Sequence, residues 1–220
     1  MRVLITGASK GIGKATAEVF AANGYEIESP SHQELDLGDP ASVVRYTEKM
    51  KGISLDAVIN NAGINEITEL EHASDEVIRS MMTVDLLGPI YLLRGSIPRL
   101  KMSGNGRIVN IGSIWAVVSK AGRSLYSAAK NGMHGVTNAL AVELAESGIL
   151  VNTVCPGFTL TELTRKNNSE EQIREISAAI PLRRMARPEE IAKAVYFLGS
   201  RENTYITGQK IVVDGGYTIQ

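Results

Sequence analysis

The sequence is poor in cysteine and has almost no net charge. Its 220 residues include a single cysteine, Cys155, and the formal net charge at pH 7 is -1. One cysteine excludes an internal disulfide framework and a cysteine-rich metal centre, and it fits a reducing compartment. The balanced charge offers no basic field for nucleic acid and no polybasic patch for a membrane surface. We therefore expect no metal, no nucleic acid and no membrane as a partner.

Long hydrophobic runs are absent as well. No apolar segment approaches the roughly 20 residues that a membrane-spanning helix needs. The chain starts at Met1 with a strand-like run and shows no signal-peptide pattern. Hydrophobic residues make up 44% and charged residues 21% of the chain, as in average soluble globular proteins. The sequence predicts a cytoplasmic enzyme or binding protein with one α/β domain over residues 1–220.

A glycine-rich turn follows the first predicted strand. Residues 3–6 are apolar or β-branched, Gly7, Gly11 and Gly13 come next, and a helical pattern runs over residues 12–23. In this context glycines let the backbone approach a pyrophosphate at a helix N-terminus. The alternative is a tight turn that binds nothing. We interpret the turn as the phosphate loop of a dinucleotide site.

The segment from Ser113 to Lys130 carries three groups suited to proton transfer. Ser113 follows a strand-like run, and Tyr126 and Lys130 lie four residues apart where a helical pattern begins. On a helix these two residues share a face. An ammonium favours the phenolate form of a neighbouring tyrosine, which suits general acid-base catalysis near neutral pH. Taken alone, the spacing is equally that of an ordinary helix pair with a surface lysine.

Together these motifs resemble those of the short-chain dehydrogenase/reductase family. The chain has T-G-x-x-x-G-x-G at residues 6–13, N-N-A-G at residues 60–63, and a serine at 113 followed by Y-x-x-x-K at residues 126–130. The resemblance spans nearly the whole chain, and its C-terminal fifth resembles the 3-oxoacyl-carrier-protein reductase-like branch. It implies an α/β fold, a Rossmann-like doubly wound parallel sheet of about seven strands flanked by helices, and hydride transfer between a nicotinamide cofactor and a carbonyl/alcohol substrate.

The resemblance also implies roles for individual residues. Ser113, Tyr126 and Lys130 would be catalytic, and Lys130 would bind the nicotinamide ribose. The cofactor-binding positions would be Gly7, Ser9, Lys10, Gly11, Ile12, Gly13, Ser31, Asp36, Leu37, Asn61, Ala62, Gly63, Tyr126, Lys130, Pro156, Gly157, Thr159 and Thr161. Asp36 would contact adenine, although a turn or capping carboxylate fits the same pattern.

The residues after the second predicted strand bear on the choice of dinucleotide. An acidic side chain there would accept the ribose 2′-hydroxyl of NAD and repel the 2′-phosphate of NADP. The expected position holds Ser31, and Lys10 in the glycine loop is a cation, so we predict NADP. If Glu28 is misplaced by one or two residues in this register, the sequence favours NAD instead.

The chain departs from the family pattern in two places. Residues 31–39 leave little room for the helix that usually precedes a third strand, whose end the run 35–37 resembles. Asp85 replaces the asparagine of the usual V-N-x-x-G motif, which helps to hold a proton-relay water. If a main-chain carbonyl holds that water, the relay survives. An ionised Asp85 would pair with Lys130 and weaken its effect on Tyr126, so we predict reduced or altered catalysis and count Asp85 among the catalytic candidates.

Two loops, 114–125 and 158–180, are expected to line the substrate pocket. The substrate contacts would be Ser113, Trp115, Arg123 and Tyr126. Trp115 offers an apolar wall or simple packing, and Arg123 either meets an acidic or phosphate-bearing substrate or lies in solvent. Residues 160–180 form either a mobile lid or an ordinary solvated helical pair.

Small residues on the predicted helix 124–147 permit close approach of a second helix, and we expect a homodimer or homotetramer. The predicted function is an NADP-dependent oxidoreductase acting on a small-molecule carbonyl/alcohol pair, as a ketone or 3-oxoacyl reductase. The alternatives are a sugar or polyol dehydrogenase, and an NADP-binding sensor with weakened catalysis.

Overall fold

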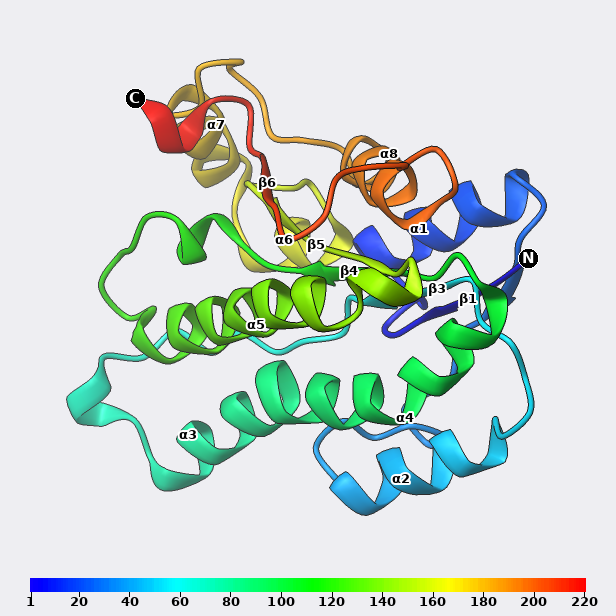
Figure 1. Ribbon diagram of the computed structural model, residues 1–220. Coiled ribbons are helices and arrows are strands. Elements are labelled where there is room, and N and C mark those ends of the chain that lie inside the picture. The colour runs from blue at the N-terminus through cyan, green and yellow to red at the C-terminus, as the bar shows by residue number, and fades with distance from the viewer.

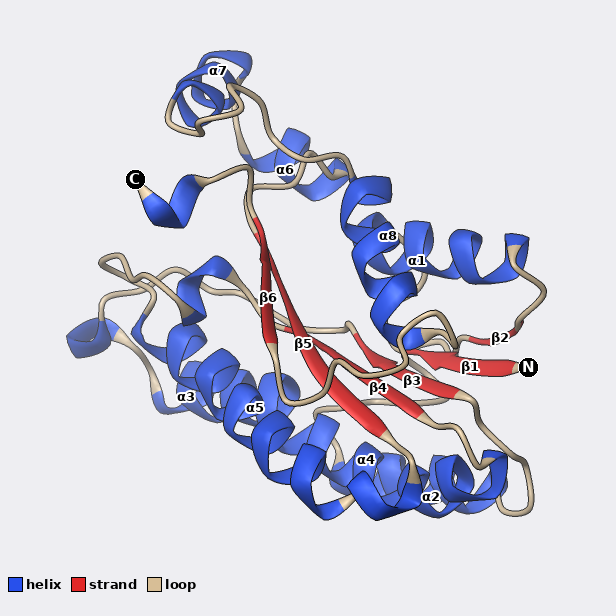
Figure 2. Cartoon of the chain, turned by 45° about the horizontal axis from the view of Figure 1, so that its top comes forward, coloured by secondary structure: helices blue, strands red, loops and turns tan.

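A parallel sheet of six strands forms the centre of the computed structural model (Figures 1 and 2), which describes residues 1–220 apart from the side chain of Leu163. The strand order is β2-β1-β3-β4-β5-β6. The strands are β1 (Arg2–Ile5), β2 (Glu26–Glu28), β3 (Ala57–Asn60), β4 (Arg107–Ile111), β5 (Leu150–Pro156) and β6 (Lys210–Val213). Because all of them run in one direction, their carboxyl ends meet at one edge of the sheet, where ligands of such folds bind.

Helices cover both faces of the sheet, as Figure 2 shows. On one side lie α1 (Gly11–Ala22) and α8 (Pro188–Gly199), and on the other lie α2 (Pro40–Lys49), α4 (Gly88–Ser103) and α5 (Ser124–Glu143). The remaining helices, α3 (Asp75–Met82), α6 (Glu162–Asn167) and α7 (Glu170–Ala178), lie toward the carboxyl edge. This arrangement confirms the predicted doubly wound α/β fold.

The strands alternate their side chains between two hydrophobic clusters. Leu4, Val58, Ile108 and Val151 lie opposite one another across the sheet and pack with residues of α2, α4 and α5. Ile5, Ile59 and Val109, the next residues on β1, β3 and β4, pack into a second cluster that includes Phe20 and the apolar side of α8. Buried strands covered on both faces read as continuous apolar runs, which is why the runs in this sequence show no polar alternation.

The edge next to β2 is where the sheet is smaller than expected. We predict about seven strands, with residues 35–37 resembling the end of the third, but these residues form no strand. Only residues 29–39 separate β2 from α2. A crossover to a parallel strand needs a dozen or more residues, so this segment can only turn back toward α2.

The region from Asp75 to Ser103 is helical throughout, with a change of pitch in its middle. A π-helical turn, Thr83–Leu87, joins α3 to α4. Pro89 follows directly after this turn, and Pro98 lies inside α4. A π turn inserts an extra residue into the helix and is frequently found at functional sites. Among the described residues, no helix has both the length and the apolar composition to cross a membrane.

Candidate active site

The glycine loop connects β1 to α1 at the carboxyl edge of the sheet. Gly7 and Gly11 have left-handed backbone angles, with φ values of 67° and 55°, which favour glycine. No side chain caps the N-terminus of α1, whose N-cap residue is Lys10, and its first turn holds no acidic residue. The N–H groups of that turn are therefore available to an anion, as a pyrophosphate requires.

Close packing explains the third glycine. A Cβ atom on Gly13 would collide with the carbonyl oxygen of Gly7 and the side-chain amide of Asn61. That amide donates hydrogen bonds to the carbonyl oxygens of Thr6 (2.9 Å) and Gly7 (3.1 Å). In return, the Thr6 hydroxyl accepts hydrogen bonds from the backbone N–H groups of Asn61 and Ala62, each at 3.0 Å. These contacts join the glycine loop to the end of β3.

A cavity of about 550 Å³ opens beside the glycine loop. Its lining comes from residues 6–9 of the loop, residues 29–32 and 34–37 after β2, residues 62–64 after β3, and Val84. The volume lies in the range of ligand pockets. With the uncapped helix end, this cavity fits the adenosine and phosphate part of a dinucleotide.

Seven predicted cofactor residues line this cavity, namely Gly7, Ser9, Ser31, Asp36, Leu37, Ala62 and Gly63. The others are not part of its lining, namely Lys10, Gly11, Ile12, Gly13, Asn61, Tyr126, Lys130, Pro156, Gly157, Thr159 and Thr161. Asp36 also makes the predicted turn contact, because its Oδ1 accepts a hydrogen bond from the Gly38 N–H at 2.7 Å.

The segment after β5 approaches the glycine loop from the other side. The Cγ2 atom of Thr161 lies 3.3 Å from the place that a Cβ on Gly11 would take. Gly157 packs so tightly that its Cβ would lie 2.6 Å from Cα of Asp214. The Thr159 hydroxyl donates to the Gly157 carbonyl at 3.1 Å. Thus Thr161 lies next to the glycine loop, whereas Gly157 packs on Asp214 after β6, and neither residue lines the cavity.

Tyr126 and Lys130 share one face of α5, as their spacing predicts. The Lys130 Nζ atom lies 5.4 Å from the centre of the Tyr126 ring. It donates a hydrogen bond to the Ile111 carbonyl at the end of β4 (3.3 Å), and only 6% of its side chain is exposed. A Cβ on Gly63, which lines the cavity, would lie 3.2 Å from Nζ. The ammonium therefore lies directly behind the cavity wall.

Asp85 is the counter-charge of Lys130. Its Oδ2 lies 3.6 Å from Lys130 Nζ, its side chain is fully buried, and its Oδ1 accepts the Ile64 N–H at 2.7 Å. Burial raises the pKa of the Asp85 carboxyl above its ordinary value, although Lys130 and the Ile64 N–H act in the opposite direction. The two residues are thus placed to pair when Asp85 is ionised.

Ser113 is held at the end of β4 with its proton free. Its Oγ accepts a hydrogen bond from the Trp115 N–H at 3.2 Å, and the residue is buried. The backbone N–H of Ser113 contacts the sulfur of Cys155 on β5, whose pKa is raised by burial. Since a hydroxyl can both accept and donate, Ser113 remains able to donate to a substrate oxygen.

An aromatic cluster lies beside Ser113. Trp115 packs edge-to-face against Phe158 and Tyr217, with ring centres 6.1 Å and 6.5 Å apart. The guanidinium of Arg123 lies 5.4 Å from the centre of the Trp115 ring and donates to Asn65 Oδ1 at 2.5 Å. Loss of solvent lowers the pKa of Arg123, with Tyr126 opposing the shift. Arg123 is therefore packed against the cluster and is not fully solvated.

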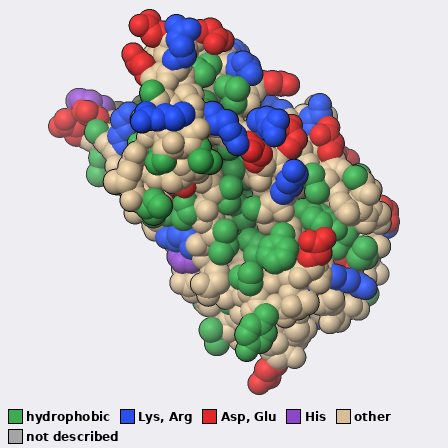
Figure 3. Space-filling view, turned by 90° about the horizontal axis from the view of Figure 1, so that it is seen from above, with side chains coloured by type: hydrophobic (Ala, Val, Ile, Leu, Met, Phe, Trp, Pro, Cys, Tyr) green, Lys and Arg blue, Asp and Glu red, His purple; other side chains and the backbone are tan. Residues whose placement is uncertain are grey.

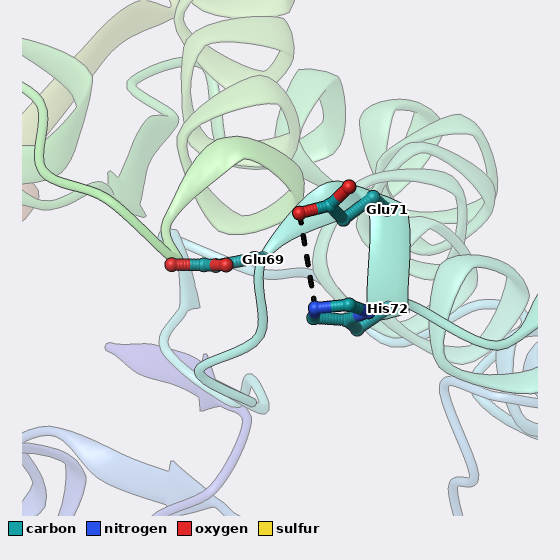
Figure 4. Close-up of side chains that lie close together, drawn as sticks. All are labelled: Glu69, Glu71 and His72. Atoms are coloured by element: carbon teal, nitrogen blue, oxygen red, sulfur yellow. Dashed lines mark ion pairs between the residues drawn. The ribbon is translucent and has the colours of Figure 1, made fainter.

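One exposed group of possible metal ligands lies away from these residues. Figure 4 shows Glu71 and His72 facing one another on a short 3-10 turn, with Glu69 just before it. The Glu71 Oε1 and His72 Nε2 atoms are 3.8 Å apart. All three side chains are exposed, and such acidic surface groups are common without an ion. We assign no metal to them.

The surface seen in Figure 3 mixes charges of both signs. Lys and Arg side chains lie among Asp and Glu side chains, with hydrophobic surface between them.

A doubly wound sheet with a glycine loop, a neighbouring cavity and a Tyr-Lys pair defines a dinucleotide-binding α/β oxidoreductase. The family model described as "Enoyl-(Acyl carrier protein) reductase" matches residues 28–218. The chain belongs to the short-chain dehydrogenase/reductase family, whose members are oxidoreductases that act on CH–OH groups with a nicotinamide cofactor. Within that family it falls in the branch of the 3-oxoacyl-carrier-protein reductases.

Individual relatives cover nearly all of the chain. The 3-oxoacyl-[acyl-carrier-protein] reductase of Escherichia coli is 36% identical, and the match covers 97% of this chain and 95% of that protein. The ligand-free structure of the Thermoplasma acidophilum aldohexose dehydrogenase matches with a TM-score of 0.94 at 33% identity, covering 100% and 94% of the two chains. A short-chain dehydrogenase family protein from Francisella tularensis matches with a TM-score of 0.90 at 31% identity, covering 100% and 99%.

The sequence predictions omit several residues of the site, among them Glu34, Phe158 and Tyr217. Glu34 lines the cavity, and its signal is the pattern S-x-x-E over residues 31–34, which is typical of a reciprocal cap. Phe158 and Tyr217 complete the aromatic cluster with Trp115. Trp115, Phe158 and Tyr217 lie far apart in the sequence, so no local pattern could have grouped them.

Proposed function

We propose that residues 1–220 form one dinucleotide-binding domain that reduces a ketone, with a 3-oxoacyl compound as the substrate class. The observation that carries this proposal is the position of Lys130 Nζ, which lies beside the Tyr126 ring and behind Gly63 of the cavity wall. A bound nicotinamide dinucleotide would supply the hydride. The side chains of this chain would hold the substrate, donate the proton and stabilise the resulting phenolate.

Ser113 and Tyr126 would hold the carbonyl oxygen and provide the proton. Ser113 can donate its hydroxyl proton to that oxygen while its Oγ accepts the Trp115 N–H. Tyr126 would transfer its phenolic proton to the same oxygen as the carbonyl carbon receives the hydride, which leaves an alcohol and a phenolate. Lys130 stabilises that phenolate by its charge, and the Ile111 carbonyl fixes the position of the ammonium.

The aromatic cluster favours an apolar substrate over a sugar. Trp115, Phe158 and Tyr217 pack edge-to-face in one cluster next to Ser113, and such apolar rings suit an alkyl chain. Arg123 lies over Trp115 and suits an acidic or phosphate group at the far end of the substrate. The likeness to an aldohexose dehydrogenase supports the second candidate, a sugar dehydrogenase.

A substrate panel tests the proposal. Oxidation of NADH or NADPH is followed with short 3-oxoacyl thioesters and simple ketones, and reduction of NAD or NADP is followed with aldohexoses. We expect turnover with the 3-oxoacyl thioesters and at most weak activity with the sugars. Faster turnover of aldohexoses would contradict a ketone reductase, and dinucleotide binding with no turnover on any substrate would favour a sensor.

NADP is the dinucleotide that the sequence predicts, and its support comes from Ser31 and Lys10. Ser31 lines the cavity, whereas Lys10 is not part of the lining. Glu28, the alternative partner of an NAD ribose, also lies outside the lining and accepts a hydrogen bond from the Tyr46 hydroxyl at 2.8 Å. Because neither Lys10 nor Glu28 lines the cavity, the selection between NAD and NADP depends on the lining side chains near Ser31.

We also propose a homo-oligomer that forms through α5. Ala128, Gly135, Ala139 and Val142 lie on an exposed side of this helix, and 78% of Val142 is exposed. A Cβ on Gly135 would meet no atom within 4 Å, whereas Gly132 packs on Leu86 inside the chain. Small exposed residues of this kind permit close approach of a second helix. The mass in solution, which should equal at least two chains, tests this.

A further inference from the structure

The turn after β2 places an acidic residue, Glu34, in the cavity lining beside Ser31. The sequence predicts only Ser31 there. Glu34 lines the same cavity as Gly7 and Ser9 of the glycine loop. Its Oε2 accepts hydrogen bonds from both the backbone N–H and the hydroxyl of Ser31, each at 2.8 Å. Among the described residues, none donates to its second oxygen, Oε1. That oxygen can therefore accept a hydrogen bond from a ligand.

The short turn explains why the carboxylate is there. With residues 29–39 too few for a helix and a parallel strand, the chain turns back directly after β2. The S-x-x-E pattern closes this turn, because the Glu34 side chain returns to the N–H of Ser31. The two Ser31 hydrogen bonds hold the pKa of the Glu34 carboxyl below its ordinary value, so it is ionised at neutral pH.

The charges around the cavity disfavour a phosphate near this turn. Its lining includes two acidic residues, Glu34 and Asp36, and among the described lining residues there is no Lys or Arg. His32 carries a positive charge only when protonated, and it lies 3.9 Å from Asp36. The charge of Lys49 acts on Glu34, but Lys49 is not part of the lining. A 2′-phosphate would thus meet negative charge with no permanent cation in the wall.

We propose that Glu34 is the residue that selects the dinucleotide, accepting the ribose 2′-hydroxyl through Oε1 and repelling a 2′-phosphate, so that the chain prefers NAD(H) over NADP(H). This inference rests on the proposed function, because it assumes that the cavity holds the adenosine half of a dinucleotide. It takes the place of the NADP preference that Ser31 and Lys10 suggest. The resulting role belongs to a side chain three residues beyond the position expected from the sequence.

Direct binding measures this preference without catalysis. Dissociation constants for NADH and NADPH are measured by titration calorimetry at about pH 8, where a histidine side chain is mostly neutral. We expect NADH to bind at least about tenfold more tightly, since a phosphate carrying nearly two charges lies close to a carboxylate. In Glu34→Gln the NADPH affinity should rise about tenfold, with the NADH affinity changed less than about threefold. In Glu34→Lys the preference should reverse.

The matched control is Glu48→Gln, which removes the same charge from an exposed position on α2 outside the cavity lining. It should leave the ratio of the two dissociation constants unchanged. Circular dichroism confirms that each variant is folded. Equal or tighter NADPH binding by the unmodified chain, or a ratio that Glu34→Gln leaves unchanged, would overturn the inference while the proposed function stands. Failure of both dinucleotides to bind would overturn the proposed function and this inference with it.

Discussion

Asp85 is a buried carboxylate that faces a buried ammonium at a position where the family pattern has asparagine. Its Oδ2 lies 3.6 Å from Lys130 Nζ and has no hydrogen-bond partner among the described residues. Burial raises the pKa of this carboxyl, and the attraction of Lys130 offsets only part of that effect. The folded chain therefore binds the Asp85 proton more tightly than the unfolded chain does.

Replacement of Asp85 by asparagine should change the dependence of stability on pH. Because its pKa is raised in the folded state, the unmodified chain loses stability as pH rises from about 4 through that raised pKa. Asp85→Asn lacks this loss, so its free energy of unfolding should improve relative to the unmodified chain from about pH 5 to about pH 8. Urea unfolding at both pH values measures the difference.

A control removes an exposed carboxylate from the same region. In Asp75→Asn, whose side chain is 86% exposed, the difference from the unmodified chain should stay nearly constant with pH. The pH-rate profile of Asp85→Asn should also shift, because the charge beside Lys130 has been removed. Parallel stability curves together with an unchanged pH-rate profile would mean that Asp85 carries no special role.

Among the elements, the π turn at Thr83–Leu87 and the glycine loop position the site. The π turn directs Asp85 toward Lys130 while Leu86 packs on Gly132 of α5. Leu86 packs inside the chain. The extra residue of a π turn leaves no mark in a 3.6-residue pattern, so sequence alone could not place it.

The role of the glycine loop in dinucleotide binding can be tested by adding one methyl group to Gly13. Gly13→Ala should destabilise the chain by about 1–3 kcal/mol and weaken dinucleotide binding, because its Cβ would collide with the Gly7 carbonyl and displace Asn61. Gly104→Ala is a matched control at the end of α4, with a left-handed φ of 68° and open space around it. It should cost about 1 kcal/mol of stability and leave binding unchanged. Equal binding by both variants would contradict the role of the loop.

At the scale of the whole molecule, periodicity and capping residues predict most of the fold. The predicted helix that starts after Asp39 is α2, and Asp39 caps it by accepting the Ala41 N–H at 2.9 Å. Buried apolar runs predict the strands, and the family resemblance predicts their parallel order. The strand that residues 35–37 resemble does not form because the chain between β2 and α2 is too short. The sequence shows that residues 31–39 are few, but it does not show how they turn.

The candidate site was predictable where residues are close in sequence or where the family pattern assigns them. The Tyr126 and Lys130 pair follows from helical spacing, and the contact between Asp85 and Lys130 follows from the family pattern. By contrast, the cavity is formed by segments from four parts of the chain, and Glu34 enters it from a turn of unusual length. Such contacts depend on tertiary packing, which local propensity does not encode.

The most direct test of the account removes one oxygen atom. In Tyr126→Phe the turnover number should fall by at least about a hundredfold, because the proton donor is lost. The dissociation constant of the reduced dinucleotide should change by less than about threefold, since the ring beside Lys130 remains. Tyr205→Phe, which removes the same oxygen from a residue that is 92% exposed, should leave both quantities unchanged. Turnover by Tyr126→Phe at the rate of the unmodified chain would contradict the proposed mechanism.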